Sequence, residues 1–111
     1  MESKIQHDLI VTIVNKGDAE KVVDASRKAG AEGGTILLGR GTGIHEQTRL
    51  FGIIIEPQKD VVLTLVKRSI SDQVLEAIVA RTELNKPGRG IAYVIPVERV
   101  AGITHLKPGE D

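Results

Sequence analysis

Two glycine-rich turns place cationic side chains directly beside backbone that could bind an anion. The first turn is GRGTG at residues 39–43, and the second turn is KPGRG at residues 86–90. Glycine permits positive φ angles and lets a ligand approach the amide nitrogens closely, and successive amides in such a turn form a concavity for anions. A neighbouring arginine adds charge and a two-pronged hydrogen-bonding group. Both turns are therefore candidate phosphate-binding loops.

Neither turn has the arrangement of the common nucleotide-binding motifs. The P-loop and the dinucleotide-binding motif require a strand before the glycines and a helix after them. Here an apolar, strand-like run follows each turn, at residues 50–56 and 91–97. From spacing alone, two tight turns with solvated cations are the simpler interpretation.

The amino-acid composition of the chain argues against several classes of function. The 111 residues contain 15 lysines and arginines against 15 acidic residues and no cysteine, so we expect no disulfide, no thiolate chemistry and no overall attraction to nucleic acid. Phe51 and Tyr93 are the only aromatic residues, too few for an RNA-stacking platform. We predict one domain over residues 1–111 with a frayed tail at 105–111, no membrane insertion and a cytoplasmic location.

The periodicity of apolar residues predicts an α+β fold. We predict strands at 8–14, 35–38, 50–56, 61–66 and 91–97, helices at 17–30 and from about 69 to 84, and a turn at 57–60. The strands at 50–56 and 61–66 are expected to form a hairpin. The overall order is the ferredoxin-like βαββαβ arrangement, an antiparallel sheet with both helices on one face.

Apolar residues on both alternating faces of the strands predict self-association. IVTIV at 10–14 and YVIPV at 93–97 are apolar at odd and even positions, and two helices can cover only one face of the sheet. The second face would leave a large apolar patch on a monomer, so we predict an oligomer, most simply with closed cyclic symmetry.

The chain resembles the PII signal-transduction family and PII-like proteins over residues 8–103. The resemblance rests on the βαββαβ order, on GTILLGRGTG at 34–43, on PGRGIAYVIPVERV at 87–100, and on RT at 81–82. It implies a homotrimer in which the T-loop of one subunit (here 39–49) and the B-loop of its neighbour (the second turn) form a cleft for an adenine nucleotide.

Carried over residue by residue, the resemblance implies a nucleotide site and a partner-binding loop. Thr35 would lie near the adenine, and the T-loop base and the B-loop would surround the phosphates. The implied nucleotide-binding residues are Thr35, Gly41, Gly43, Lys86, Gly88, Arg89 and Gly90. The implied partner-binding residues are Arg40, Thr42, His45, Glu46 and Arg49.

Several positions depart from the family pattern. Ile91, Gly102 and Thr104 stand where the family has cationic residues, so AMP or ADP is favoured over Mg-ATP. The T-loop is short and has no counterpart of the tyrosine that is modified in the family, which argues against uridylylation. The resemblance thus implies a divergent PII-like member that regulates a partner protein, such as a membrane transporter or a metabolic enzyme.

The sequence is also compatible with two alternative functions. A trimeric metal- or anion-binding protein of the same fold and a ligand-free scaffold are the alternatives. An enzyme is not expected, because no nucleophile–base or carboxylate pair has a workable spacing. No metal site is expected either: His7, His45 and His105 have no ligand spacing and are interpreted as surface side chains, with His45 beside Glu46 the one pair to test.

Overall fold

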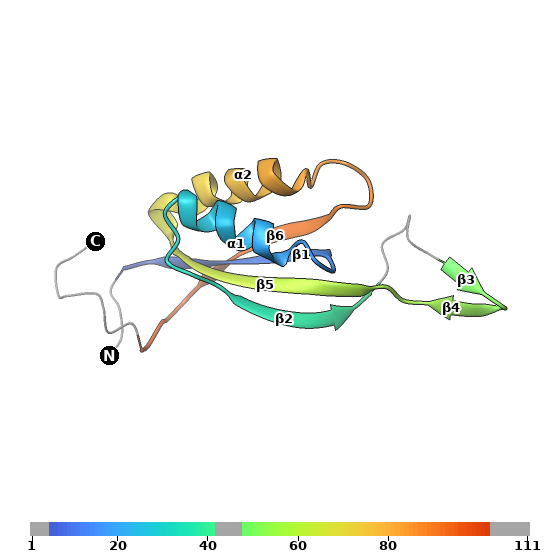
Figure 1. The fold of residues 1–111 in the computed structure, drawn as a ribbon. Coiled ribbons are helices and arrows are strands. Elements are labelled where there is room, and N and C mark those ends of the chain that lie inside the picture. Colours follow the sequence, from blue (N-terminus) through green and yellow to red (C-terminus); the bar gives the residue numbers. More distant parts are fainter. Residues whose placement is uncertain (1–4, 42–47, 103–111) are drawn as a thin grey trace.

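The computed structural model describes residues 5–41 and 48–102 of the chain (Figure 1). Strands and helices follow one another in the predicted βαββαβ order, with a short two-stranded ribbon inserted in the middle. The elements are β1 (His7–Asn15), α1 (Ala19–Lys28), β2 (Thr35–Arg40), β3 (Thr48–Leu50), β4 (Ile53–Ile55), β5 (Gln58–Lys67), the short 3-10 helix η1 (Arg68–Ile70), α2 (Ser71–Thr82) and β6 (Gly90–Val97).

Four strands form one sheet in the order β2-β5-β1-β6, and each neighbouring pair is antiparallel. Helices α1 and α2 lie together on one face of this sheet (Figure 1). The predicted ferredoxin-like α+β architecture is therefore confirmed.

The hydrophobic core lies between the sheet and the two helices. Strand side chains alternate between the two faces of a sheet, so every second residue of β1 and β5 reaches this core. The core is built from aliphatic side chains of both layers: Ile10, Val14, Val22, Val62, Val66, Val74 and Ile78. The residues between them in β1 and β5 must face the other way.

The opposite face of the sheet is apolar and is covered by no described helix (Figure 1). Ile91, Tyr93 and Ile95 of β6 are 56%, 43% and 44% exposed. Tyr93 is in register with Val11 of β1, which is in register with Leu63 of β5. An apolar row therefore crosses the sheet on the side away from the helices, as the apolar pattern of the strands predicted.

The predicted strand at 50–56 and the predicted turn at 57–60 are wrong. Strands β3 and β4 pair with each other in a ribbon that projects beyond the end of the sheet (Figure 1). Their two-residue turn is Phe51-Gly52, with φ angles of 51° and 80°, as tight hairpins of this kind require. Strand β5 begins at Gln58 and pairs with β2 and β1, so the predicted hairpin between 50–56 and 61–66 does not form.

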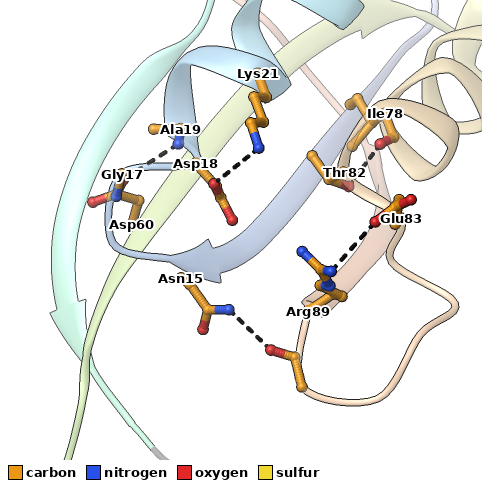
Figure 2. Close-up of polar contacts among 11 residues, drawn as sticks. Asn15, Gly17, Asp18, Ala19, Lys21, Asp60, Ile78, Thr82, Glu83 and Arg89 are labelled. Atoms are coloured by element: carbon orange, nitrogen blue, oxygen red, sulfur yellow. Dashed lines mark hydrogen bonds and ion pairs between the residues drawn. The ribbon is translucent and has the colours of Figure 1, made fainter.

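The start of β5 is polar and therefore resembles a turn in sequence. It can form a buried strand because its polar side chains have distant partners. Lys59 and Asp60 are both only 6% exposed. The Asp60 Oδ2 atom accepts hydrogen bonds from the backbone nitrogens of Gly17 (2.9 Å) and Ala19 (3.3 Å) at the start of α1. Asp18 holds the N-cap position of α1 but makes no side-chain cap bond. A carboxylate from β5 thus caps the positive end of α1 (Figure 2).

His7 is buried, so its predicted surface position is wrong. It is 4% exposed, and its Nδ1 atom lies 2.9 Å from the carbonyl oxygen of Ile5. The reason is its place at the start of β1, which has β5 on one side and β6 on the other. His45 and His105 lie outside the described residues, as does the tail at 105–111.

Candidate anion-binding site

The fold brings residues 39–41, the described part of the first turn, and the second turn to the same end of the sheet. Strands β1 and β2 end there, at Asn15 and Arg40, while β5 and β6 begin there, at Gln58 and Gly90. We call this the loop end of the sheet. Strands β5 and β1 separate β2 from β6, which places the two turns roughly 14 Å apart across the sheet. Residues about 50 positions apart in the sequence can thus contribute to one surface.

The second turn is packed tightly against β1 at Gly90. Its φ angle is 138°, and a Cβ atom at this position would collide with the carbonyl oxygen of Ile13 and meet the Leu84 side chain at 3.2 Å. Gly88 also has a positive φ, 78°, but a Cβ there would meet nothing within 4 Å. Gly90 is therefore required for close approach, whereas Gly88 is required for backbone conformation alone.

Asn15 joins the second turn to β5. Its Nδ2 atom donates to the carbonyl oxygen of Gly88 at 2.9 Å (Figure 2), and its Oδ1 atom accepts from Lys59 Nζ at 2.8 Å. Lys59 is paired through the sheet with Gly39 of β2, at the start of the first turn. One side chain at the end of β1 thus lies between the bases of the two turns and holds a group from each side.

Replacement of Asn15 by alanine is expected to lower the free energy of unfolding by about 1 to 3 kcal/mol, because it removes both contacts of the amide. The matched variant Asn15→Asp keeps an acceptor for Lys59 and loses the donor to Gly88. It should retain most of the stability but release the second turn, which amide hydrogen exchange at residues 88–90 would detect. Chemical unfolding of Asn15→Ala with an unchanged midpoint would contradict this role for the bridge.

The cations of the second turn are paired with one carboxylate in the same chain. Glu83, just after α2, lies with Oε1 3.1 Å from Lys86 Nζ and with Oε2 3.4 Å from Arg89 Nη2. Lys86 first, and then Arg89, hold the pKa of the Glu83 carboxyl below its ordinary value of 4.5. Glu83 is therefore ionised at neutral pH, and its single negative charge offsets part of the charge of the two cations that would face a phosphate.

A pocket of about 230 Å³ opens beside the first turn. It is lined by Lys16, Leu38, Gly39, Arg40, Gln58, Lys59 and Asp60. Three of these residues are cationic, and one of the three, Lys59, also donates to Asn15. Asp60 accepts from the backbone at the start of α1. Lys16, Gln58 and Lys59 line this pocket although no sequence motif indicates them as site residues. The incorrect turn at 57–60 hid two of them, since strand pairing is what places them beside Gly39.

The predicted nucleotide-binding residues are only partly brought together. Gly41 follows β2 at the loop end of the sheet, where its nitrogen donates to the Pro57 carbonyl oxygen at 3.2 Å. Gly90 begins β6 at that same end. Thr35 begins β2 and is five residues before Arg40, a distance of about 17 Å along the strand. Gly43 lies outside the described residues. Within one chain, Thr35 is therefore remote from the two turns.

The predicted partner-binding residues belong to the segment between β2 and β4. Arg40 is exposed at the end of β2, and Arg49 lies in β3. Thr42, His45 and Glu46 fall outside the described residues, so the His45–Glu46 pair is not described. Of the T-loop, Gly39 and Arg40 end β2, whereas Thr48 and Arg49 belong to the projecting ribbon.

Residues 5–41 and 48–102 lack two further kinds of feature. No group of three or more histidine, cysteine, aspartate or glutamate side chains is arranged to hold a metal ion there. Nor does that part of the chain contain a helix long and apolar enough to cross a membrane.

Comparison with known proteins identifies the family. No curated protein matches the chain at a significant level. Among solved structures, a crystal structure of Arabidopsis thaliana PII bound to citrate has the same fold, with a TM-score of 0.69 and 22% sequence identity over 89% of this chain and 84% of that chain. The model of the family described as Nitrogen regulatory protein P-II matches residues 7–107. The predicted resemblance is confirmed, and the chain belongs to the P-II nitrogen regulatory protein family.

Proposed function

We propose that this chain is a regulatory protein that binds an adenine nucleotide at the loop end of its sheet. Membership of the P-II family supports the regulatory role. The observation that carries the ligand proposal is that two glycine-rich, cationic turns, distant in sequence, lie at one end of one sheet. Cations on both sides of β1 suit a ligand with an elongated anionic part.

The number of available cations favours AMP or ADP over Mg-ATP. Arg89 and Lys86 are the cations of the second turn, and both already share Glu83. Ile91 is the apolar residue that directly follows the second turn, and Gly102 follows β6 with a φ of 94°. The family resemblance implies cations at these two positions. A ligand with one or two phosphates needs fewer positive partners than a triphosphate does.

The uncovered face of the sheet supports a homotrimer. The row from Leu63 through Val11 to Tyr93 is apolar, and Tyr93, its β6 member, is 43% exposed in a single chain. Apolar area of this kind is stabilised by burial against another copy. A closed trimer would cover these faces and place the T-loop of one subunit near the second turn of its neighbour. Thr35, remote from the turns of its own chain, would then contribute from another subunit.

The ribbon β3–β4 is proposed to carry the signal to a partner protein, such as a transporter or a metabolic enzyme. It projects beyond the sheet (Figure 1), and Phe51 at its tip is 95% exposed. A nucleotide at the base of the T-loop would change the orientation or order of the loop. The partner would then respond to the ligand through its differential affinity for the two states of the loop.

Isothermal titration of the purified protein with AMP, ADP and ATP, with and without magnesium, tests the nucleotide proposal. We expect micromolar binding with about one site per chain, tightest for AMP or ADP. Arg89→Ala should weaken binding roughly tenfold or more, because it removes a charge-assisted contact to phosphate. Arg27→Ala is the matched control, since Arg27 lies in the last turn of α1 at the other end of the sheet.

Two results would contradict the proposal. The first is the absence of heat with every nucleotide from a protein shown to be trimeric by light scattering. The second is equal weakening by Arg89→Ala and Arg27→Ala, which would show that the loss reflects overall charge and no specific contact.

A second candidate function is the binding of a small anion without an adenine group. The pocket at the first turn, with Lys16, Arg40 and Lys59 in its lining, favours it. Its volume of about 230 Å³ suits a small polyvalent anion better than a whole nucleotide. Titration with citrate and with inorganic phosphate separates the two functions. Binding of these anions that Lys16→Ala abolishes, with no binding of nucleotides, would favour the second candidate.

A further inference from the structure

We propose that Glu83 is an internal competitor for the cations of the second turn and that it sets how tightly this turn binds a phosphorylated ligand. This inference deepens the proposed function and rests on it. Glu83 uses its two carboxylate oxygens separately: Oε1 lies 3.1 Å from Lys86 Nζ, and Oε2 lies 3.4 Å from Arg89 Nη2. Figure 2 shows the contact with Arg89. The carboxylate therefore contacts these two cations as a ligand phosphate would.

The backbone conformation of Glu83 is unusual for its residue type. It follows the last residue of α2 with φ 55° and ψ 43°, the left-handed region in which glycine is the ordinary residue. Its backbone carbonyl oxygen accepts a hydrogen bond from the Lys86 nitrogen at 3.0 Å. The helix end alone would favour glycine, which has no side chain, yet a glutamate stands at this position. Its side chain contacts both cations of the second turn.

The backbone of residues 88–90 in the second turn is held in place independently of the Glu83 side chain. Asn15 binds the carbonyl oxygen of Gly88, and Gly90 is packed against the backbone of Ile13. The side chains of Glu83, Lys86 and Arg89 are by contrast 47%, 62% and 45% exposed. An arriving phosphate therefore meets a fixed backbone and three movable charged side chains, and it can take Lys86 and Arg89 only by displacing the carboxylate.

Removal of the Glu83 charge should tighten binding of phosphorylated ligands. Exposed ion pairs are individually weak, so the loss of two of them corresponds to an affinity gain of about three- to tenfold. The gain should be confined to the phosphate part of the ligand. Adenosine, which carries no phosphate, should bind with unchanged affinity.

The experiment compares binding of ADP, pyrophosphate and adenosine to the full chain and to Glu83→Gln. Glu76→Gln is the matched control, because Glu76 is an exposed glutamate of α2 that lies seven residues before Glu83. A second variant, Glu83→Gly, suits the left-handed backbone and removes the side chain, so it guards against a folding effect of the glutamine. Arg89→Gln in the Glu83→Gln background should reduce the gain, because only one of the two freed cations, Lys86, then remains.

Each outcome decides the inference. Tighter ADP and pyrophosphate binding by both Glu83 variants, with Glu76→Gln unchanged, supports it. Tighter pyrophosphate binding without any ADP binding supports the role of Glu83 and contradicts the nucleotide function. Unchanged affinity overturns the inference, as does an equal gain for adenosine, which would indicate a structural effect. No binding of either anion to any variant overturns both proposals.

Discussion

Replacement of Gly90 by alanine is expected to lower the free energy of unfolding by about 2 to 5 kcal/mol. The added Cβ would collide with the carbonyl oxygen of Ile13, which is backbone and cannot move aside as a side chain could. It would also meet the Leu84 side chain at 3.2 Å, and the φ of 138° is itself unfavourable for alanine. Gly90 is paired with Val14 at the start of β6, so the strain falls on the first pairs between β1 and β6.

A loss of this size is a large part of the total stability of a small domain. Chemical unfolding at one fixed protein concentration measures it, because association with other chains also contributes to the apparent stability. Gly88→Ala is the matched control: it has a positive φ of 78° but open space around the new Cβ. It should lose only about 1 kcal/mol. Equal losses for the two variants would show that contact with β1 is not what requires glycine at position 90.

Replacement of Tyr93 by glutamate is expected to separate the proposed trimer into single chains. Tyr93 lies in the middle of β6 on the uncovered face, 43% exposed and in register with Val11. In an assembly that buries this face, each subunit would bring an unpaired carboxylate into an apolar interface, at several kcal/mol per charge. In the isolated chain the same carboxylate remains in water, so the fold itself should be retained.

Size-exclusion chromatography with light scattering measures this effect. The unmodified protein should have a mass of about 36 kDa, three times the 12.0 kDa chain, and Tyr93→Glu should have the mass of one chain. Ala80→Glu is the matched control, because it adds the same charge to an exposed position of α2 on the helix side of the sheet. If Ala80→Glu dissociates the oligomer and Tyr93→Glu does not, the interface lies on the helices.

If the trimer forms through this face, loss of assembly should also weaken nucleotide binding. Thr35 is about 17 Å along β2 from the first turn, so a site that includes Thr35 and both turns needs a second subunit. Titration of Tyr93→Glu with ADP would show whether the turns of one chain suffice. Full affinity in a monomer would remove Thr35 from the site and leave the loop end of a single sheet as the binding surface.

The regular elements of the core could be predicted from local sequence. Ala19 and Val22 of α1, and Val74 and Ile78 of α2, recur at helical spacing, and the alternating residues of β1 face a core and an uncovered side. These periods follow from backbone geometry and need no knowledge of distant residues. Gly30, with a φ of 116°, likewise ends the first helical segment for a local reason.

The error at 50–60 shows where local pattern is insufficient. III at 53–55 has the composition of a buried strand, yet it forms half of a projecting ribbon. QKD at 58–60 has the composition of a turn, yet it begins the longest strand of the sheet. Pairing with β2 and β1 and the contacts of Lys59 and Asp60 with residues more than 40 positions away decide both cases.

The candidate site, likewise, could be predicted only in part from local sequence. Glycines and cations in the two turns indicated anion chemistry from residue type alone, and family resemblance assigned them to one site. Their meeting at one end of the sheet, the bridge through Asn15 and the sharing of Lys86 and Arg89 by Glu83 depend on strand order and side-chain placement. Residue types and short-range periods specify which groups can bind an anion. Only long-range strand pairing specifies which of those groups are neighbours, because it brings together segments that are far apart in the sequence.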